Sequence, residues 1–116
     1  MWVADTEGTL VGFAVGREVD GQGYLEQLDV HPEHGRRGVG RRLVQAVMDW
    51  SAARGYVAVR LMIELYVPWT VPFYEKLGSR IMDPSEFTEE LLIAGFGEAE
   101  AIPVMGMNVL MTAATQ

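Results

Sequence analysis

Cysteine is absent from the 116 residues. Its absence excludes a disulfide framework, a thiolate metal site and a cysteine nucleophile, and it fits a reducing compartment, so we expect a cytoplasmic protein. The longest apolar runs are interrupted by charge or glycine well short of a membrane span. The first residues, MWVADTEG, also lack the basic and apolar regions of a signal peptide, so no membrane association is expected.

Positive charge is scarce in this chain. Nine Lys and Arg stand against 16 Asp and Glu, and the net charge of −7 argues against nucleic-acid binding. Four of the nine cations lie in one short stretch: Arg36, Arg37, Arg41 and Arg42. An acidic chain that gathers its cations in one place is expected to bind a compact anion there, with a solvated arginine loop as the alternative.

The length predicts a single domain over residues 1–116, and a hydrophobic content of 49% is enough for a modest core. Alternating apolar residues and flanking turn residues predict strands at residues 2–5, 10–17, 24–30 and 56–65. A helical pattern that begins at Gly40 and ends before Gly55 lies between the last two strands. Because such a strand–helix–strand unit crosses over right-handed, these two strands are expected to form a parallel pair.

Shorter elements are predicted in the rest of the chain. Thr70 is expected to cap a short helix that ends at Gly78, and a short strand is expected at residues 79–82. A closing strand is expected at residues 103–111. Residues 112–116 are expected to be frayed.

A third helix is predicted to start at Asp83. The sequence DPSE offers Asp as N-cap, Pro at the first helical position and Glu at the third. This helix is expected to turn Phe87 and Leu91 inward and to fade at residues 95–97.

Three glycines, at positions 35, 38 and 40, lie between the third strand and the first helix. Glycines let a backbone approach an anion closely and expose successive N–H groups, and the positive end of the helix adds to the attraction. The stretch has no GK[ST] sequence, which excludes a P-loop, and its glycines do not form GxGxxG, which excludes a dinucleotide fold. The sequence HPEH is joined by no third ligand cluster, so no metal site is expected.

The sequence VHPEHGRRGVGRRL, followed by an amphipathic helix, resembles motif A of the GNAT superfamily of N-acetyltransferases, usually written [QR]-x-x-G-x-[GA]. The sequence VPFYEKLG resembles the F-Y-x-x-L-G-F segment of the same family. The resemblance covers residues 2–82 and implies an α/β fold, with a mixed, mainly antiparallel sheet and a βαβ crossover at the cofactor cleft. Gly35 stands where the motif usually has Gln or Arg. The chain starts at the hairpin that, in the family, follows a first strand and two helices that wall the acceptor site.

The resemblance implies that acetyl-CoA is the acetyl donor and that its pyrophosphate binds the loop and the first helical turn. The residues implied for the pyrophosphate are Arg36, Arg37, Gly38, Val39, Gly40 and Arg41. Those implied for the pantetheine arm, through main-chain groups, are Leu28, Asp29 and Val30. In the family this arm threads a gap where the strands before and after the motif A helix splay apart.

Acetyl transfer to an amine sets two further requirements. An amine with a pKa of about 10.4 is mostly protonated at pH 7, so a general base must take its proton. Glu26 shares strand parity with the main-chain site at residues 28–30 and is a candidate base, with a solvated carboxylate as the alternative; His31 and His34 are further candidates. The leaving thiolate needs a proton or a hydrogen bond, which the resemblance assigns to Tyr74, with a core aromatic as the alternative.

The predicted function is therefore transfer of acetyl from acetyl-CoA to an amine of a small molecule or peptide. The alternative is a non-catalytic module that binds acetyl-CoA or CoA, or that mediates interaction as a dimer. A purely structural dimerisation domain would leave the arginine and glycine loop unexplained. The sheet edge near residues 2–5 lacks a partner strand and one sheet face is bare, so a homodimer is expected.

Overall fold

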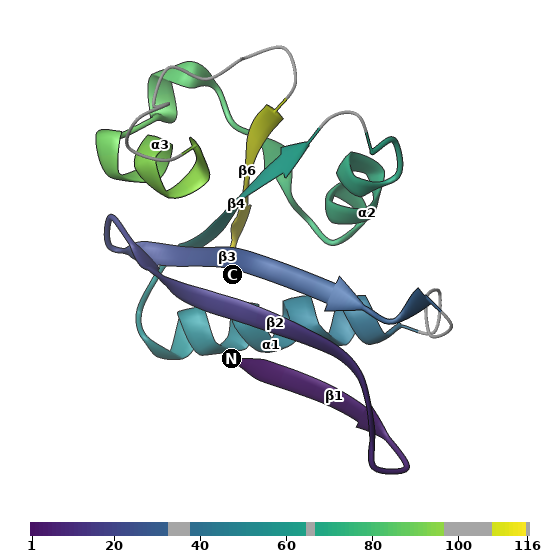
Figure 1. Cartoon of the computed structure of the whole chain (residues 1–116). Coiled ribbons are helices and arrows are strands. Elements are labelled where there is room, and N and C mark those ends of the chain that lie inside the picture. The colour runs from purple at the N-terminus through teal and green to yellow at the C-terminus, as the bar shows by residue number, and fades with distance from the viewer. Residues whose placement is uncertain (33–37, 65–66, 97–107, 116) are drawn as a thin grey trace.

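The computed structural model describes residues 1–32, 38–64, 67–96 and 108–115. A six-stranded sheet, in the order β1-β2-β3-β4-β6-β5, carries helices on its faces (Figure 1). The strands are β1 (Trp2–Thr6), β2 (Thr9–Val19), β3 (Gln22–Val30), β4 (Ala58–Glu64), β5 (Arg80–Ile81) and β6 (Asn108–Ala114). The helices are α1 (Val39–Ala53), α2 (Thr70–Lys76) and α3 (Glu89–Phe96), with the 3-10 turn η2 at Pro84–Glu86. None of the described helices is long and apolar enough to cross a membrane.

The sheet is mixed, and one neighbouring pair of strands, β3 and β4, is parallel. The other neighbours are antiparallel. The parallel pairing joins only Gly23 to Val59 and Tyr24 to Arg60, and beyond these positions the two strands diverge (Figure 1). The predicted fold class, the crossover and the splayed strands are therefore confirmed.

Two tight turns build the antiparallel meander of β1, β2 and β3. The turns occupy residues 7–8 and 20–21, and all four residues have positive φ, as type I′ hairpin turns require. Because these turns continue the twist of the strands, the ladder runs up to the turn residues. The strands β2 and β3 are consequently longer than predicted.

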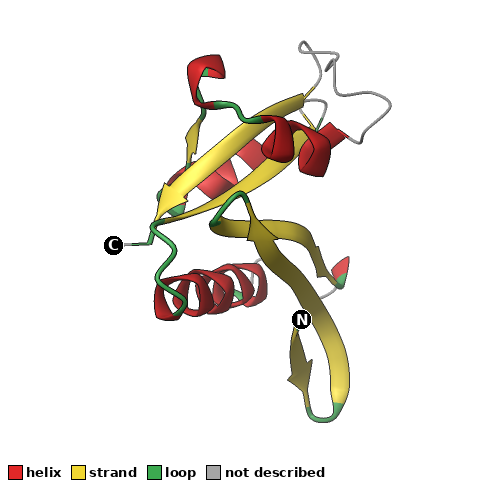
Figure 2. Ribbon diagram, turned by 90° about the vertical axis from the view of Figure 1, so that its left-hand side faces the viewer, coloured by secondary structure: helices red, strands yellow, loops and turns green. Residues whose placement is uncertain are grey.

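The helices divide between the two faces of the sheet. The longest helix, α1, lies beside the three N-terminal strands, and the shorter helices lie around the C-terminal ones (Figure 2). The core on the α1 and α2 face consists of Val11, Ala14, Leu25, Val39, Leu43, Val47, Val59, Leu61, Ile63, Tyr74 and Met111. The smaller core on the α3 face consists of Val19, Tyr24, Met82, Leu91 and Leu110. We call these the α1 face and the α3 face.

The helix α1 ends as predicted. The Gly55 N–H donates to the Ala52 carbonyl at 3.0 Å, and the Tyr56 N–H donates to the Ser51 carbonyl at 2.9 Å. These two bonds form a Schellman motif, which satisfies carbonyls that the helix leaves unpaired. The chain then turns directly into β4, so α1 is fixed at its C-terminal end against the parallel strand pair.

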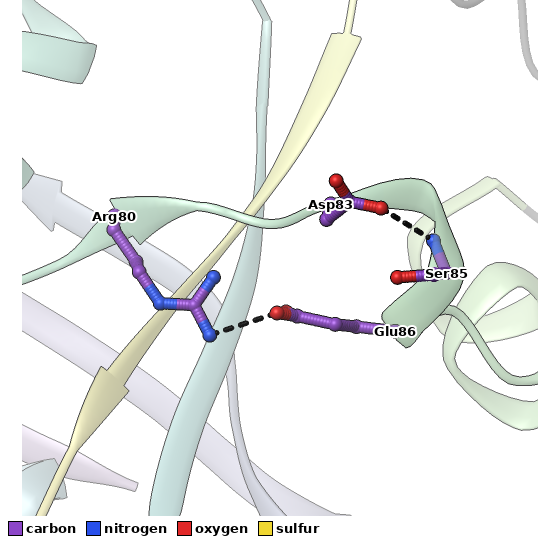
Figure 3. Close-up of polar contacts among 4 residues, drawn as sticks. All are labelled: Arg80, Asp83, Ser85 and Glu86. Atoms are coloured by element: carbon purple, nitrogen blue, oxygen red, sulfur yellow. Dashed lines mark hydrogen bonds and ion pairs between the residues drawn. The ribbon is translucent and has the colours of Figure 1, made fainter.

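The prediction of a helix that starts at Asp83 is wrong. The Asp83 carboxylate does accept a hydrogen bond from the Ser85 N–H at 2.9 Å, but it caps only the turn η2 (Figure 3). Phe87 is extended, with ψ of 137°. The helix α3 starts after Thr88, whose hydroxyl accepts from the Leu91 N–H at 3.2 Å. Phe87 and Leu91 pack inward as predicted.

The end of the chain is more ordered than predicted. The strand β6 pairs with β4 along its whole length, so the prediction that residues 112–116 fray is wrong for the described part. Beyond the strand, the Thr115 N–H donates to the Val57 carbonyl at 3.0 Å and the Thr115 hydroxyl donates to the Tyr56 carbonyl at 2.9 Å. Positions 103–107 of the predicted closing strand lie outside the described residues.

Candidate functional site

The candidate site is the fork between β3 and β4. Along β3 the Cα pairing with β2 jumps from Gln27 to Leu25, which leaves Glu26 as the extra residue of a β-bulge. Leu25 and Leu28 consequently contact the same core on the α1 face, although they are three positions apart. A bulge bends its strand, and β3 turns away from β4 just beyond this point.

The far half of β3 has hydrogen-bonding groups that point into the fork. The His31 N–H donates to the Val11 carbonyl of β2 at 2.7 Å. Because successive peptide groups of a strand alternate sides, the N–H and C=O groups of Val30 and Leu28 point away from β2. The parallel pairing with β4 has already ended, so these groups are available to a ligand. The main-chain groups predicted to hold the pantetheine arm therefore lie at the mouth of the fork.

The first turn of α1 lies at the open end of β3. Gly38 precedes the helix in the left-handed conformation, with φ of 79° and no side-chain cap, and the first turn contains no acidic residue. The N–H groups of Val39, Gly40 and Arg41 belong to the first turn, where helices have no internal partners. Arg41 is exposed. These four residues can hold an anion as predicted, whereas Arg36 and Arg37 lie outside the described residues.

A close contact joins this turn to α2. A Cβ at Gly40 would lie 3.4 Å from Phe73 Cζ and 3.5 Å from Val30 Cγ2, within ordinary contact distance, so both side chains lie against this turn of α1. The rings of Phe73 and Tyr74 pack edge to face at 5.0 Å between centroids. The two sequence motifs, separated by residues 44–70, are thus brought together on the α1 face.

Tyr74 is buried against the α1-face core, with 6% of its surface exposed. Burial raises the pKa of its hydroxyl to about 12. Among the described residues the fully buried side-chain polar atoms without a partner are Ser51 Oγ and Arg60 Nε, and the Tyr74 hydroxyl is not one of them. The Ser79 N–H donates to the Tyr74 carbonyl at 3.0 Å in the Schellman motif that ends α2 at Gly78. The Tyr74 hydroxyl is therefore neutral near pH 7, and the backbone of this residue is fixed.

The start of α2 differs from the prediction. Trp69, not Thr70, is the N-cap residue, and no side chain caps the helix. The Thr70 hydroxyl instead donates to the Val67 carbonyl at 2.8 Å, which closes the turn before the helix. Trp69 is 70% exposed and does not pack in the core, whereas Phe73 packs against the α1-face core.

The prediction that Glu26 shares strand parity with residues 28–30 is wrong. The bulge breaks the strand parity, and the carboxylate of Glu26 accepts from the Arg17 Nε–H at 2.9 Å in an exposed ion pair. Arg17 in turn lies over the ring of Tyr24, which belongs to the α3-face core. Glu26 is thus turned toward the α3 face and not into line with Leu28. A role as base, reached from that face, stays a prediction.

The remaining candidate residues are Asp29, His31 and His34. The Asp29 carboxylate is exposed and accepts from the Gln27 side-chain amide at 2.9 Å, and the main-chain groups of Asp29 face β2 and not the fork. His31 is exposed at the end of β3, and His34 lies outside the described residues. Within the ranges that the structure covers, no three His, Asp or Glu side chains gather into a metal site.

A comparison with protein families decides what this arrangement is. The family model described as acetyltransferase (GNAT) family matches residues 1–79, more than half of the chain. The chain belongs to the GNAT family of acetyltransferases. An acetyltransferase of Yersinia pestis (strain Pestoides F) is 28% identical over 91 residues, which cover 78% of this chain and 64% of that protein. A Yersinia pseudotuberculosis acetyltransferase matches equally well, and the chain spans less than two thirds of the length of either GNAT relative.

Solved structures share the GNAT fold seen here. The ribosomal-protein-S18-alanine N-acetyltransferase of Escherichia coli has a TM-score of 0.70 and 19% identity, over 97% of this chain and 66% of that one. The PaiA N-acetyltransferase of Thermoplasma acidophilum, solved in complex with coenzyme A, has a TM-score of 0.72 and 18% identity, over 97% and 58%. At these identities the likeness concerns the fold alone.

Proposed function

We propose that this chain binds acetyl-CoA in the fork and transfers the acetyl group to an amine of a small molecule or peptide in the cytoplasm. One observation carries the proposal. The close contact between Gly40 and Phe73 joins the capless first turn of α1 to the buried Tyr74, across the free peptide groups of β3. A neighbour of the same fold, the PaiA enzyme, was solved with coenzyme A, which supports the choice of donor.

The backbone of the fork suits the two ends of the donor. The first turn of α1 offers N–H groups and the exposed Arg41 to a pyrophosphate. The peptide groups of Leu28 and Val30 suit the amide-rich pantetheine arm, which needs both donors and acceptors. One of these N–H groups also serves the oxyanion that forms when the amine attacks the thioester carbonyl.

Tyr74 serves the leaving thiolate. With a pKa raised to about 12, its hydroxyl remains protonated at neutral pH. A group this weakly acidic favours a hydrogen bond to the thiolate over complete loss of its proton, so the sulfur leaves as a hydrogen-bonded thiolate that water then protonates. The attacking amine must lose its proton first, and Glu26 is the carboxylate of β3 that we propose for that step.

Two measurements test the proposal. Acetyl-CoA should raise the melting temperature, because it binds the folded state only. Arg41→Gln should reduce that rise, whereas Arg54→Gln, at the opposite end of α1, should not. If acetyl-CoA gives no shift in the wild-type protein, the donor assignment is overturned.

The second measurement separates an enzyme from a binding module. An enzyme releases CoA thiol from acetyl-CoA when it is offered a panel of primary amines, and a binding module does not. Thermal stabilisation without thiol release from any amine would favour the non-catalytic alternative. The exposed ion pair between Glu26 and Arg17 supports this alternative, because it engages the carboxylate that would act as the base.

We also propose that the chain forms a homodimer through β1. This strand ends the sheet, and no described strand pairs with its outer edge. Val3 is 60% exposed on it. When the β1 strands of two copies pair antiparallel with Ala4 opposite Ala4, Val3 lies opposite Asp5 and no like charges lie opposite each other. Light scattering at micromolar concentration should give twice the monomer mass, and a monomer would contradict the dimer without touching the donor site.

A further inference from the structure

A row of polar side chains crosses the α3 face of the sheet at the vertex of the fork. The strand registers align one residue from each of five neighbouring strands: Arg17, Tyr24, Arg60, Thr112 and Arg80. Residues in register point to the same face, and Tyr24 assigns the row to the α3 face because it packs in that core. Three of the nine cations of this acidic chain thus lie in one line, outside the motif A loop.

The two outer arginines of the row have carboxylate partners. Arg17 donates from Nε to Glu26 at 2.9 Å. Arg80 donates from an Nη to Glu86 at 2.9 Å, from the strand β5 to the turn η2 (Figure 3). Both pairs are at least partly exposed, so neither arginine requires a further anion.

The central arginine differs from both. Arg60 is partly buried, its Nε is closed off from solvent, and that Nε has no hydrogen-bond partner. Among the described residues no carboxylate pairs with it. A guanidinium stays charged at any physiological pH, and removing an unpaired charge from water is costly. Because the described carboxylates leave this cation unpaired, it is open to an anion from outside.

The position of Arg60 connects it to the reaction. Its register partner on β3 is Tyr24, and this is the last paired position before the strands diverge. The donor site proposed above lies on the α1 face of the same fork. Arg60 therefore lies at the vertex of the fork, on the face of the sheet opposite the proposed donor site.

We propose that Arg60 binds a carboxylate of the acceptor, so that the acceptor is an amine that bears a carboxylate, such as an amino acid. The planar guanidinium matches a carboxylate in two parallel hydrogen bonds. The inference rests on the proposed acetyl transfer, and it adds the class of acceptor to that proposal. Arg60 is in this view a specificity-determining residue, and the donor site does not depend on it.

The decisive experiment compares each acid with its amide. Glycine, leucine, phenylalanine and glutamate are each offered beside the corresponding α-amide, and CoA release is followed for the wild type and Arg60→Gln. The substitution should lower kcat/KM for the acids about 10- to 100-fold, mainly through KM, since a hydrogen-bonded charge pair is lost. The amides should change less than about twofold, and the KM for acetyl-CoA should not change. Arg80→Gln is the matched control, because that arginine already has a partner, and it should leave the acid-to-amide ratio as it is.

A binding measurement keeps this inference separate from turnover. N-acetyl-leucine carries the carboxylate of a product and should raise the melting temperature of the wild type but not of Arg60→Gln, whereas N-acetyl-leucinamide should raise neither. If the wild type releases CoA with amines but the acid-to-amide ratio is the same in Arg60→Gln, the carboxylate site is overturned and acetyl transfer stands. If no amine releases CoA but N-acetyl-leucine stabilises only the wild type, acetyl transfer is overturned and the carboxylate site stands.

The folded state of the variant is checked in the same series. Arg60→Met removes an unpaired charge and should melt at the same temperature as the wild type or higher. Should Arg60→Gln fail to fold, Arg60→Met takes its place in the acid and amide comparison. A clear loss of stability in both variants would show that Arg60 has a structural partner and would overturn the inference.

Discussion

Each face of the sheet buries one tyrosine, one in apolar surroundings and the other beside charged groups. Tyr74 on the α1 face and Tyr24 on the α3 face are 6% and 4% exposed. Burial raises the pKa of both hydroxyls, but only at Tyr24 is the effect opposed by a cation, Arg17, whose guanidinium lies 5.6 Å from the ring centre. The α1 face therefore holds a neutral hydrogen-bond donor in apolar surroundings, whereas the α3 face is organised by charge.

This difference separates two tasks that the fork must perform. The donor side needs a fixed, uncharged hydroxyl and free peptide groups, which a packed apolar core supplies by holding the backbone still. The acceptor side needs discrimination, which charged groups supply better than apolar contacts. The predictions below test this separation, and the first uses the tyrosine of the opposite face as its control.

The largest effect is expected from Tyr74→Phe. Loss of the hydrogen bond to the leaving thiolate should lower kcat for CoA release by about 100-fold, with little change in the KM for acetyl-CoA. Tyr24→Phe, with an equally buried ring on the opposite face, should change kcat by less than about threefold. Steady-state kinetics of both variants measure the contrast. Equal losses in the two would show that ring packing, and not the Tyr74 hydroxyl, determines the rate.

The same tyrosine should make the fold sensitive to alkali. The folded-state pKa of Tyr74 is raised from 10.0 to about 12, so the unfolded chain loses this proton at a lower pH. The contribution of Tyr74 to the free energy of unfolding is therefore present below pH 10 and lost as the pH rises to 12. The full contribution is about 2–3 kcal/mol, at 1.36 kcal/mol for each pKa unit. Urea unfolding at pH 8 and pH 11.5 should show a smaller alkaline loss for Tyr74→Phe than for the wild type. An identical loss in both would contradict the burial of this hydroxyl.

The contact between α1 and the parallel strands β3 and β4 should tolerate no added side chain at Gly23. A Cβ at Gly23 would clash with Ser51 Oγ and would lie 3.1 Å from Val59 Cγ2. Gly23→Ala should therefore destabilise the fold by about 1–3 kcal/mol. Ser51→Ala alone should be neutral or slightly stabilising, because Ser51 Oγ is buried without a partner. Thermal melts of both variants and their combination test the contact, and the double variant should recover part of the loss.

The smallest effect is expected from the exposed pair of Arg17 and Glu26. Their side chains are 46% and 45% exposed, so either substitution to Gln should change the free energy of unfolding by less than about 1 kcal/mol. The two variants nevertheless separate the roles of Glu26. If it is the general base, Glu26→Gln slows CoA release at pH 7 and Arg17→Gln does not. Equal rates in both variants would remove Glu26 from the mechanism.

The sequence was most informative where motif and periodicity coincide. The helix from residue 39 to 53, its stop at Gly55 and the parallel crossover followed from local patterns, and the two motifs correctly indicated the family. The contact that brings them together could be expected only from that resemblance, because no local pattern relates Gly40 to Phe73.

Other features could not be read from spacing alone. Strand parity failed at Glu26 because one extra residue in β3 shifts every later side chain to the other face. The alignment of Arg17, Arg60 and Arg80 requires the registers of four strand pairs, which hairpin turns and hydrophobic alternation determine only in part. The start of α3 was misplaced because two good caps, Asp83 and Thr88, lie only five positions apart.

The last strand along the chain is not the last strand in space. In the sheet order β6 lies between β4 and β5, so β4 obtains its second neighbour, and β5 its only neighbour among the described strands, after residue 108 has been synthesised. A growing chain can form the meander of β1, β2 and β3 early, since its contacts are local. The edge of β4 that faces away from the fork remains open until β6 has been synthesised. The strand that forms one side of the fork is therefore held on both edges only once β6 is in place, and loss of β6 should loosen the sheet and the fork together.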